Sequence, residues 1–156
     1  MAHLGLDSST WSDHTNIQPT MMKLLGLHDD YVPDGRVLVE LLDPADLPPA
    51  LRVDRPALLR LGQVYTQLEA AVGRFGLDTL RASTRALAST SPGDARYNAI
   101  ENQLQQLGAA RDGVAGRIRA ALDGAAFGGQ PVNTQQARAL IRQGEEMLAA
   151  AAHLAA

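Results

Sequence analysis

Apolar side chains recur every three or four positions along residues 55–156, and this spacing limits the possible folds more than any other feature. Residues at that spacing lie on one face of an α-helix, which turns once in about 3.6 residues. A neighbouring element has to cover each face, so we expect an antiparallel bundle of three long helices, or docking of these helices on a larger domain. The stripes are Leu58, Leu61, Tyr65, Leu68, Val72 and Phe75; Tyr97, Ile100, Leu104, Leu107, Val114, Ile118 and Leu122; and Ala137, Leu140, Ile141, Gly144, Met147, Leu148, Ala151 and Leu154.

Glycine, proline and capping residues mark the ends of these helices. The first stripe slips in phase near Gly73, which predicts one kinked helix or two helices in near continuity. Ser91 and Pro92 suit the start of the next helix. Asn133, followed by Gln136, has the pattern of a capping box at the start of the last helix. Glycines within the helices lower helix propensity, so we expect close backbone approach at some of Gly108, Gly113, Gly116 and Gly144.

Residues 1–54 contain signals for shorter elements. Pro19 suits the first turn of a short helix that stops at Gly26. Residues 37–42 fit either a short helix or a strand, and the proline-rich residues 43–56 are expected to form an extended linker. The sequence therefore predicts a mainly α fold, with a short N-terminal helical and loop segment followed by the helical bundle.

Composition excludes several classes of function. No cysteine is present, so neither disulfides nor thiolate metal sites can form. No apolar run approaches the roughly 20 residues of a membrane span. Residues 1–54 carry nine acidic and three basic side chains, whereas residues 55–156 carry eight acidic and eleven basic ones. The basic side chains form no run and aromatic residues are scarce, so nucleic-acid binding is not expected.

A carboxylate, an imidazole and a hydroxyl group, from Asp13, His14 and Thr15, stand just before the helix at Pro19. A carboxylate beside an imidazole in an irregular segment is what a divalent-metal site takes from a protein. His14 is therefore a candidate metal ligand, and Asp13 is expected to orient the imidazole or to cap the helix. Too few suitable residues precede them to complete such a site, so we expect partners outside this chain.

Other polar and sulfur-containing residues have simpler interpretations. His28 and His153 are expected at the surface. The aspartates in residues 29–34 favour a turn over a calcium loop, because their spacing does not match an EF-hand. Met21 and Met22 are expected to fill gaps in the core.

Several short motifs follow one another along nearly the whole chain. They are Ser12-Asp13-His14-Thr15, Ile17-Gln18-Pro19-Thr20, Leu24-Leu25-Gly26-Leu27, Asp29-Asp30-Tyr31, Asp34-Gly35-Arg36-Val37-Leu38, Phe75-Gly76-Leu77-Asp78-Thr79-Leu80 and Ala125-Ala126-Phe127-Gly128-Gly129. As a set, these motifs resemble the C-terminal part of bacterial phosphoesterases of the alkaline-phosphatase superfamily. That superfamily also includes nucleotide pyrophosphatase/phosphodiesterases and sulfatases.

The resemblance implies that His14 closes the ligand set of one of two divalent metals, usually zinc, with Asp13 and Thr15 behind it. Such paired metals flank an alkoxide nucleophile that attacks phosphorus. The family's nucleophilic Thr or Ser, its early aspartate ligands and its Asp-His and His-Gly motifs have no counterpart here. The isolated chain is therefore expected to be inactive and to need a catalytic α/β domain or a second copy as partner. Residues 1–3 lack the basic start of a signal peptide, so the signal of an exported parent enzyme would lie upstream.

Two functions stay open from the sequence. The first is the C-terminal portion of a metal-dependent phosphoesterase, a hydrolase. The second is a free-standing helical interaction module without catalytic activity. On the first interpretation, apolar side chains near the N-terminus rest on an absent domain, or else find another surface on the bundle or on a second copy. These side chains are Met21, Met22, Leu24, Leu25, Leu27, Val37, Leu38 and Leu41.

Overall fold

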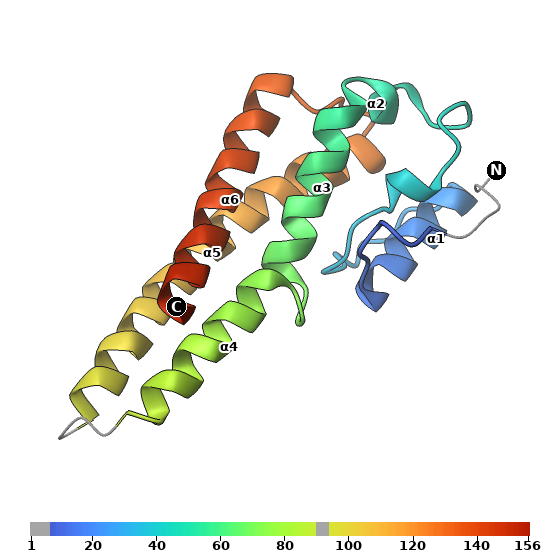
Figure 1. The fold of residues 1–156 in the computed structure, drawn as a ribbon. Helices are drawn as coiled ribbons and strands as arrows, with labels where there is room; N and C mark the ends of the chain where they lie inside the picture. The colour runs from blue at the N-terminus through green and yellow to red at the C-terminus, as the bar shows by residue number, and fades with distance from the viewer. Residues whose placement is uncertain (1–6, 90–93) are drawn as a thin grey trace.

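The computed structural model describes residues 7–89 and 94–156 (Figure 1). This part of the chain is mainly helical and contains no β-strand element, which confirms the mainly α character predicted from the sequence. The elements are the 3₁₀ helix η1 (His14–Asn16), α1 (Ile17–Leu25), the 3₁₀ helix η2 (Val39–Leu41), α2 (Pro49–Arg52), α3 (Arg55–Glu69), α4 (Arg74–Leu87), α5 (Ala95–Ala126) and α6 (Thr134–Ala155).

The four longer helices α3, α4, α5 and α6 enclose most of the core. Figure 1 shows α3 and α4 following one another along the molecule, with α5 running beside them and α6 lying against all three. The apolar stripes predicted from the sequence face this core, since Leu61, Ile118 and Ala151 are fully buried. Val72 is an exception, because it lies in the link between α3 and α4 and is 59% exposed.

The first stripe forms two helices, which decides between the two alternatives for its phase slip. The chain leaves the helical path after Glu69 and resumes it at Arg74. Gly73 allows this tight link, because a Cβ there would lie 2.7 Å from the carbonyl oxygen of Gln67 and 2.9 Å from that of Ala70. Any other residue would force the two helices apart at this point.

The last helix begins as the sequence predicts. The side chain of Asn133 accepts a hydrogen bond from the backbone N–H of Gln136 at 2.9 Å, which satisfies a free donor in the first turn. The predicted start of the preceding helix at Ser91 and Pro92 lies outside the described residues. Within them, α5 begins at Ala95.

The N-terminal segment is packed against the long helices. Helix α1 ends at Gly26, whose φ of 67° is the left-handed cap that glycine favours, and it begins at Ile17, just before Pro19. Residues 37–42 contain one turn of 3₁₀ helix. The prediction of an extended linker over residues 43–56 is wrong in part, because helix α2 lies within it. Leu47 and Leu51 of this range are buried and pack in the common core. Val37, Val39 and Leu42, which precede it, belong to the same core.

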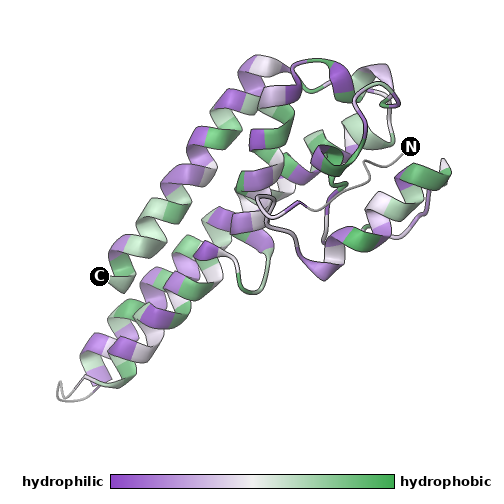
Figure 2. Ribbon diagram, turned by 45° about the vertical axis from the view of Figure 1, so that its right-hand side comes forward, coloured by the Kyte–Doolittle hydropathy of each residue, from purple (hydrophilic) through white to green (hydrophobic). Residues whose placement is uncertain are grey.

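The apolar side chains near the N-terminus divide into two groups. Val37 and Leu38 are buried, so this part of the segment has found the bundle as its cover. Helix α1 and the residue after its cap leave apolar side chains exposed, and Figure 2 shows this helix with apolar (green) residues. Met21 is 50% exposed, so its expected place in the core is wrong, whereas Met22 is half-buried. The exposed group is Ile17, Met21, Leu24, Leu25 and Leu27.

Within the described ranges 7–89 and 94–156, no helix combines the length and the apolar character needed to cross a membrane.

Close backbone approach occurs at only one of the four glycines singled out from the sequence. A Cβ on Gly144 would clash with Cγ1 of Val64 and lie 3.2 Å from Cδ1 of Leu68, so this glycine lets α6 and α3 approach closely. The expectation is wrong for Gly108, Gly113 and Gly116, where a Cβ would meet open space.

We expect Gly144→Ala to lower the free energy of unfolding by about 1–2 kcal/mol, because the cost of overpacking against stiff Val64 exceeds the gain in helix propensity. Gly116→Ala, on α5, is the matched control and should raise it by about 0.5–1 kcal/mol, since nothing opposes the new methyl group. Urea denaturation of both variants measures the two changes. Stabilisation by both substitutions would contradict the tight α3–α6 contact.

Candidate functional site

Asp13 and His14 form a pair at the start of η1. The Oδ1 atom of Asp13 accepts a hydrogen bond from the backbone N–H of Thr15 at 3.0 Å and lies 3.0 Å from Nδ1 of His14. The Thr15 N–H holds the pKa of Asp13 below its ordinary value, so the carboxylate stays charged. When the ring proton is on Nδ1, facing this carboxylate, the Nε2 lone pair is available to a metal. The His14 side chain is 88% exposed, so this atom can be reached from outside.

The loop that follows α1 returns to this pair. Gly35 lies against η1 so closely that a Cβ there would clash with the carbonyl of Thr15 and lie 2.6 Å from the backbone nitrogen of Asn16. The buried side chain of Asn16 accepts a hydrogen bond from the backbone N–H of Arg36 at 2.9 Å. The two motifs that the resemblance singled out, residues 12–20 and 34–38, therefore lie side by side.

The loop is held on α3 by the buried guanidinium of Arg36, which pairs with Glu40 of the same loop and bonds to Thr66 of α3. The guanidinium of Arg36, which is 3% exposed, donates to both carboxylate oxygens of Glu40 at 2.8 and 2.6 Å. Its Nε donates to the hydroxyl of Thr66 on α3 at 2.9 Å. Gly62 makes room for the charged group, because a Cβ there would lie 2.9 Å from Nη1 of Arg36. Arg36 therefore links η1 to the bundle, because it bonds to Asn16 of η1 and to Thr66 of α3.

The sequence analysis assigned no role to the Arg36–Glu40 pair. A signal was present, because a single arginine stands four residues before a glutamate within the otherwise apolar run of residues 37–42. Such a charge in an apolar segment is stable only when it is paired and hydrogen-bonded. Its third partner, Thr66, is 30 residues away in the sequence and has no local signal.

A cleft of about 360 Å³ lies between η1 and the end of α3. His14, Asn16, Asp34, Tyr65 and Glu69 are among its lining residues. The Tyr65 hydroxyl donates to the carbonyl oxygen of Asp34 at 2.7 Å, and burial raises the pKa of Tyr65 to about 12, so it is a neutral donor. The Nδ2 group of Asn16 is buried without a hydrogen-bond partner.

Other acidic side chains of this cleft are already engaged. Glu69 accepts a hydrogen bond from Arg111 at 2.5 Å, and the carboxylate of Asp34 lies 4.0 Å from Arg119. Among the residues that the structure describes, no three His, Cys, Asp or Glu side chains gather as a group able to hold a metal. The structure thus brings Asp13 and Thr15 to His14 but adds no further protein ligand.

The aspartates of residues 29–34 form a turn, as the sequence favours. The carboxylate of Asp29 accepts a hydrogen bond from the backbone N–H of Tyr31 at 3.2 Å. His28 and His153 are exposed, as predicted. The ring of His28 meets that of Phe127 edge to face, with 5.6 Å between the centroids.

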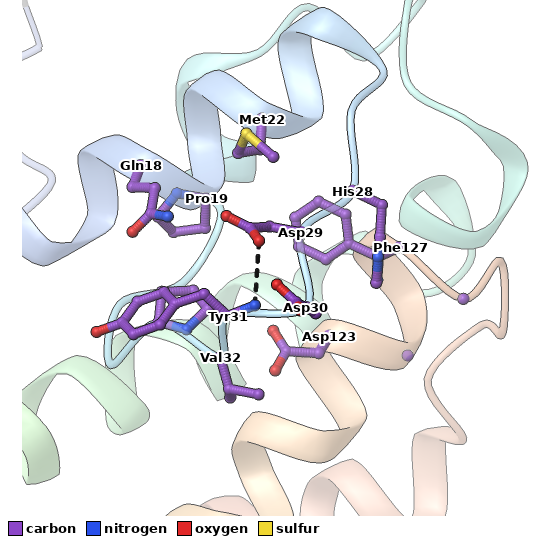
Figure 3. A pocket seen from close by; sticks show the side chains of 13 residues that line it. Gln18, Pro19, Met22, His28, Asp29, Asp30, Tyr31, Val32, Asp123 and Phe127 are labelled. Atoms are coloured by element: carbon purple, nitrogen blue, oxygen red, sulfur yellow. Dashed lines mark hydrogen bonds between the residues drawn. The ribbon is translucent and has the colours of Figure 1, made fainter.

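A second cavity, of about 390 Å³, lies between α1, residues 28–33 and the C-terminal end of α5 (Figure 3). Asp123 on α5 lines it and is partly buried. Removal from water raises the pKa of this carboxyl group, and the nearby Arg119 guanidinium opposes the shift. The sequence analysis assigned nothing to this cavity, because its walls come from segments about 100 residues apart.

We expect Glu40→Gln to lower the free energy of unfolding by about 3 kcal/mol, because it leaves the buried Arg36 charge without its counter-ion. Glu145→Gln is the matched control. It removes a carboxylate paired with Arg60 at the surface, where both side chains are about half exposed, and should change stability by less than about 0.5 kcal/mol. Thermal and urea unfolding measure both. Equal small effects would show that the buried pair does not hold the loop.

The raised pKa of Asp123 predicts a pH-dependent effect of Asp123→Asn. The protonated carboxyl stabilises the fold at low pH, and this contribution is lost as pH rises through the pKa that Asp123 has in the folded state. Asparagine does not ionise, so the melting temperature of the variant, relative to wild type, should rise between about pH 4 and pH 7. Glu146→Gln, at an exposed position on α6, should show no such trend. A constant difference across this range would contradict the burial of Asp123.

Comparison of the chain with protein-family models, curated proteins and solved structures gave no match. What the site can do therefore follows from its own geometry and chemistry.

Proposed function

We propose that this chain is the C-terminal portion of a metal-dependent phosphoesterase of the alkaline-phosphatase type, in which His14 binds one of two zinc ions. The observation that carries the proposal is the Asp13–His14 pair, in which a carboxylate oxygen lies 3.0 Å from Nδ1 of an imidazole that is 88% exposed. The set of motifs around this pair, from residue 12 to residue 38, adds the family resemblance.

The residues at this site can supply one zinc ligand, the imidazole of His14. Imidazole nitrogen is a common zinc ligand, and a carboxylate behind it raises its basicity and sets its orientation. Asp13 stands in that supporting position. The nucleophile and the remaining ligands belong to another part of the enzyme, so the isolated chain is expected to be inactive.

In the assembled enzyme, paired zinc ions would stabilise the attacking and leaving oxygens of a phosphate ester. The residues of this chain do the positioning. Asp13 lies beside Nδ1 of His14 and orients the ring, and Asn16 with Gly35 ties η1 to the loop. Arg36, paired with Glu40 of the same loop, then fixes that loop on α3 through its hydrogen bond to Thr66, so the imidazole is presented from a fixed support.

We further propose that the missing catalytic α/β domain covers the exposed apolar side of α1. Helix α1 follows η1 without a break, so a domain that supplies the other ligands of the His14 site has to lie beside the first turn of α1. Ile17, three residues after His14, is 62% exposed, and Met21 continues the apolar side one turn later. In this arrangement α3 and α4 act as one arm of a three-helix antiparallel bundle that supports the site.

The same exposed side chains support a second candidate function, a helical interaction module that associates with a second copy of itself. Exposed apolar side chains on one helix favour association of either kind. Sedimentation of the 156-residue chain over a range of concentrations separates the two functions. The phosphoesterase proposal expects at most weak self-association, and a tight dimer that covers α1 favours the module.

Activity tests the proposal directly. We expect no hydrolysis of a chromogenic phosphodiester by the 156-residue chain with added zinc. The protein produced when the reading frame is extended into the DNA directly upstream should hydrolyse it. In that longer protein, His14→Ala should reduce kcat/KM by at least about 100-fold and lower the zinc content, because it removes a metal ligand.

His153→Ala, which removes an exposed histidine from the far end of α6, is the control and should leave activity and zinc content unchanged. Asp13→Asn should lower zinc affinity about 10- to 100-fold while leaving the fold intact. Turnover by the 156-residue chain, unchanged zinc content in His14→Ala, or no open reading frame upstream would each refute the proposal.

A further inference from the structure

The cavity beside the end of α5 combines apolar walls with aromatic rings. Pro19 and Met22 of α1 form one wall, and Val32 contributes from the loop. Tyr31 and Phe127 supply the aromatic rings. A hollow of about 390 Å³ with such walls has the size and character of a small-molecule site.

Acidic side chains line the same cavity from two directions. Asp29 and Asp30 belong to the loop after α1, and Asp123 belongs to α5. In the view of Figure 3 the three carboxylates lie between the rings of Tyr31 and Phe127. His28 also lines the cavity, and Arg119 lies near Asp123, but no lysine or arginine is among the lining residues, so the three carboxylates give the interior a negative character.

A cation of the chain itself already binds at this end of α5. The amino group of Lys23 donates a hydrogen bond to the carbonyl oxygen of Ala126 and lies 5.9 Å from the centroid of the Phe127 ring. Both contacts are those by which ammonium groups are held, at the negative end of a helix dipole and over an aromatic face. Lys23 is not among the residues that line the cavity, but it already occupies a place over the Phe127 ring, so a ligand cation has to be held mainly by the carboxylates.

The geometry of the carboxylates disfavours a bare metal ion. They do not come together as a metal-binding group within the described part of the chain. Asp29 is also engaged with the backbone of Tyr31. Carboxylates spread around an apolar space suit a cation that has a larger body and a diffuse charge, and an anion would be repelled by all three.

We propose that this cavity binds a small organic ammonium ion, with the charged nitrogen near Asp30 and Asp123 and the alkyl groups against Phe127 and Met22. The ring of Tyr31, which lines the cavity, adds cation–π attraction to the charge pairing, and Phe127 offers apolar contact. The proposal is independent of the His14 site, which lies in the other cleft beside α3. It gives the chain a ligand-binding site of its own, whichever catalytic domain it joins.

The test is a titration of the 156-residue chain with choline, followed by the amide resonances in NMR. We expect saturable shifts at Gly124, Phe127 and Gly128, which line the cavity. The uncharged isostere 3,3-dimethylbutan-1-ol, which has the same shape, should bind at least about tenfold more weakly, because it gains nothing from the carboxylates. Equal affinity for the two compounds, or no saturable shift, would overturn the proposal.

Two variants locate the site. Asp123→Asn and Phe127→Leu should each weaken choline binding at least about fivefold, and Glu146→Gln on α6 should not change it. Circular dichroism confirms that each variant is folded. His14→Ala should bind choline as wild type does, which keeps this result separate from the phosphoesterase proposal. Tighter binding of calcium at the same amides, or undiminished choline binding in both Asp123→Asn and Phe127→Leu, would count against an organic cation site.

Discussion

The buried pair of Arg36 and Glu40 is the interaction on which the arrangement of the N-terminal segment depends. Burying a guanidinium is costly unless every donor direction is used, and here two go to the carboxylate and one to the hydroxyl of Thr66. Gly62 on α3 leaves the space that the charge needs. Arg36 also ties residues 36–40 to η1, because its backbone N–H donates to the side chain of Asn16.

Two clefts of opposite character result from that placement. On one side of the segment, His14 lines a cleft in which Asp13 lies beside the imidazole, Glu69 is paired with Arg111, and Asp34 lies 4.0 Å from Arg119. On the other side, between α1 and the end of α5, carboxylates, aromatic rings and His28 line an apolar space that has no lysine or arginine in its lining. In the first cleft, His14 is suited to bind a metal whose other ligands come from another domain. The second cleft is suited to bind a cation with residues of this chain alone. Residues 28–38 form the loop that lies between the two clefts.

The positions of the helices were largely predictable from the sequence, whereas much of the candidate site was not. The stripes from Leu58 onward predicted the long helices, because a period near 3.6 residues is a local property. Asp13 and Thr15 were placed beside His14 for the same reason, since they are its neighbours in the chain. Thr66 and Gly62, which hold Arg36, carry no local signal, and the site depends on them through contacts between distant segments. The prediction that residues 43–56 are extended was wrong in part. Prolines limit the local backbone conformation, but they do not indicate that Leu47 and Leu51 are buried in the core.

By itself the sequence determined where the helices run, where Gly26 and Asn133 end or begin them, and that a carboxylate and an imidazole adjoin each other at Asp13 and His14. These are properties of neighbouring residues, set by periodicity, capping and covalent order. Tertiary structure alone decided that Gly144 is the one close approach among the four helix glycines, that Arg36 is buried, and that Asp123 shares a cavity with the loop after α1. Those outcomes depend on contacts between side chains that are far apart in the sequence, and these contacts form only when the helices pack.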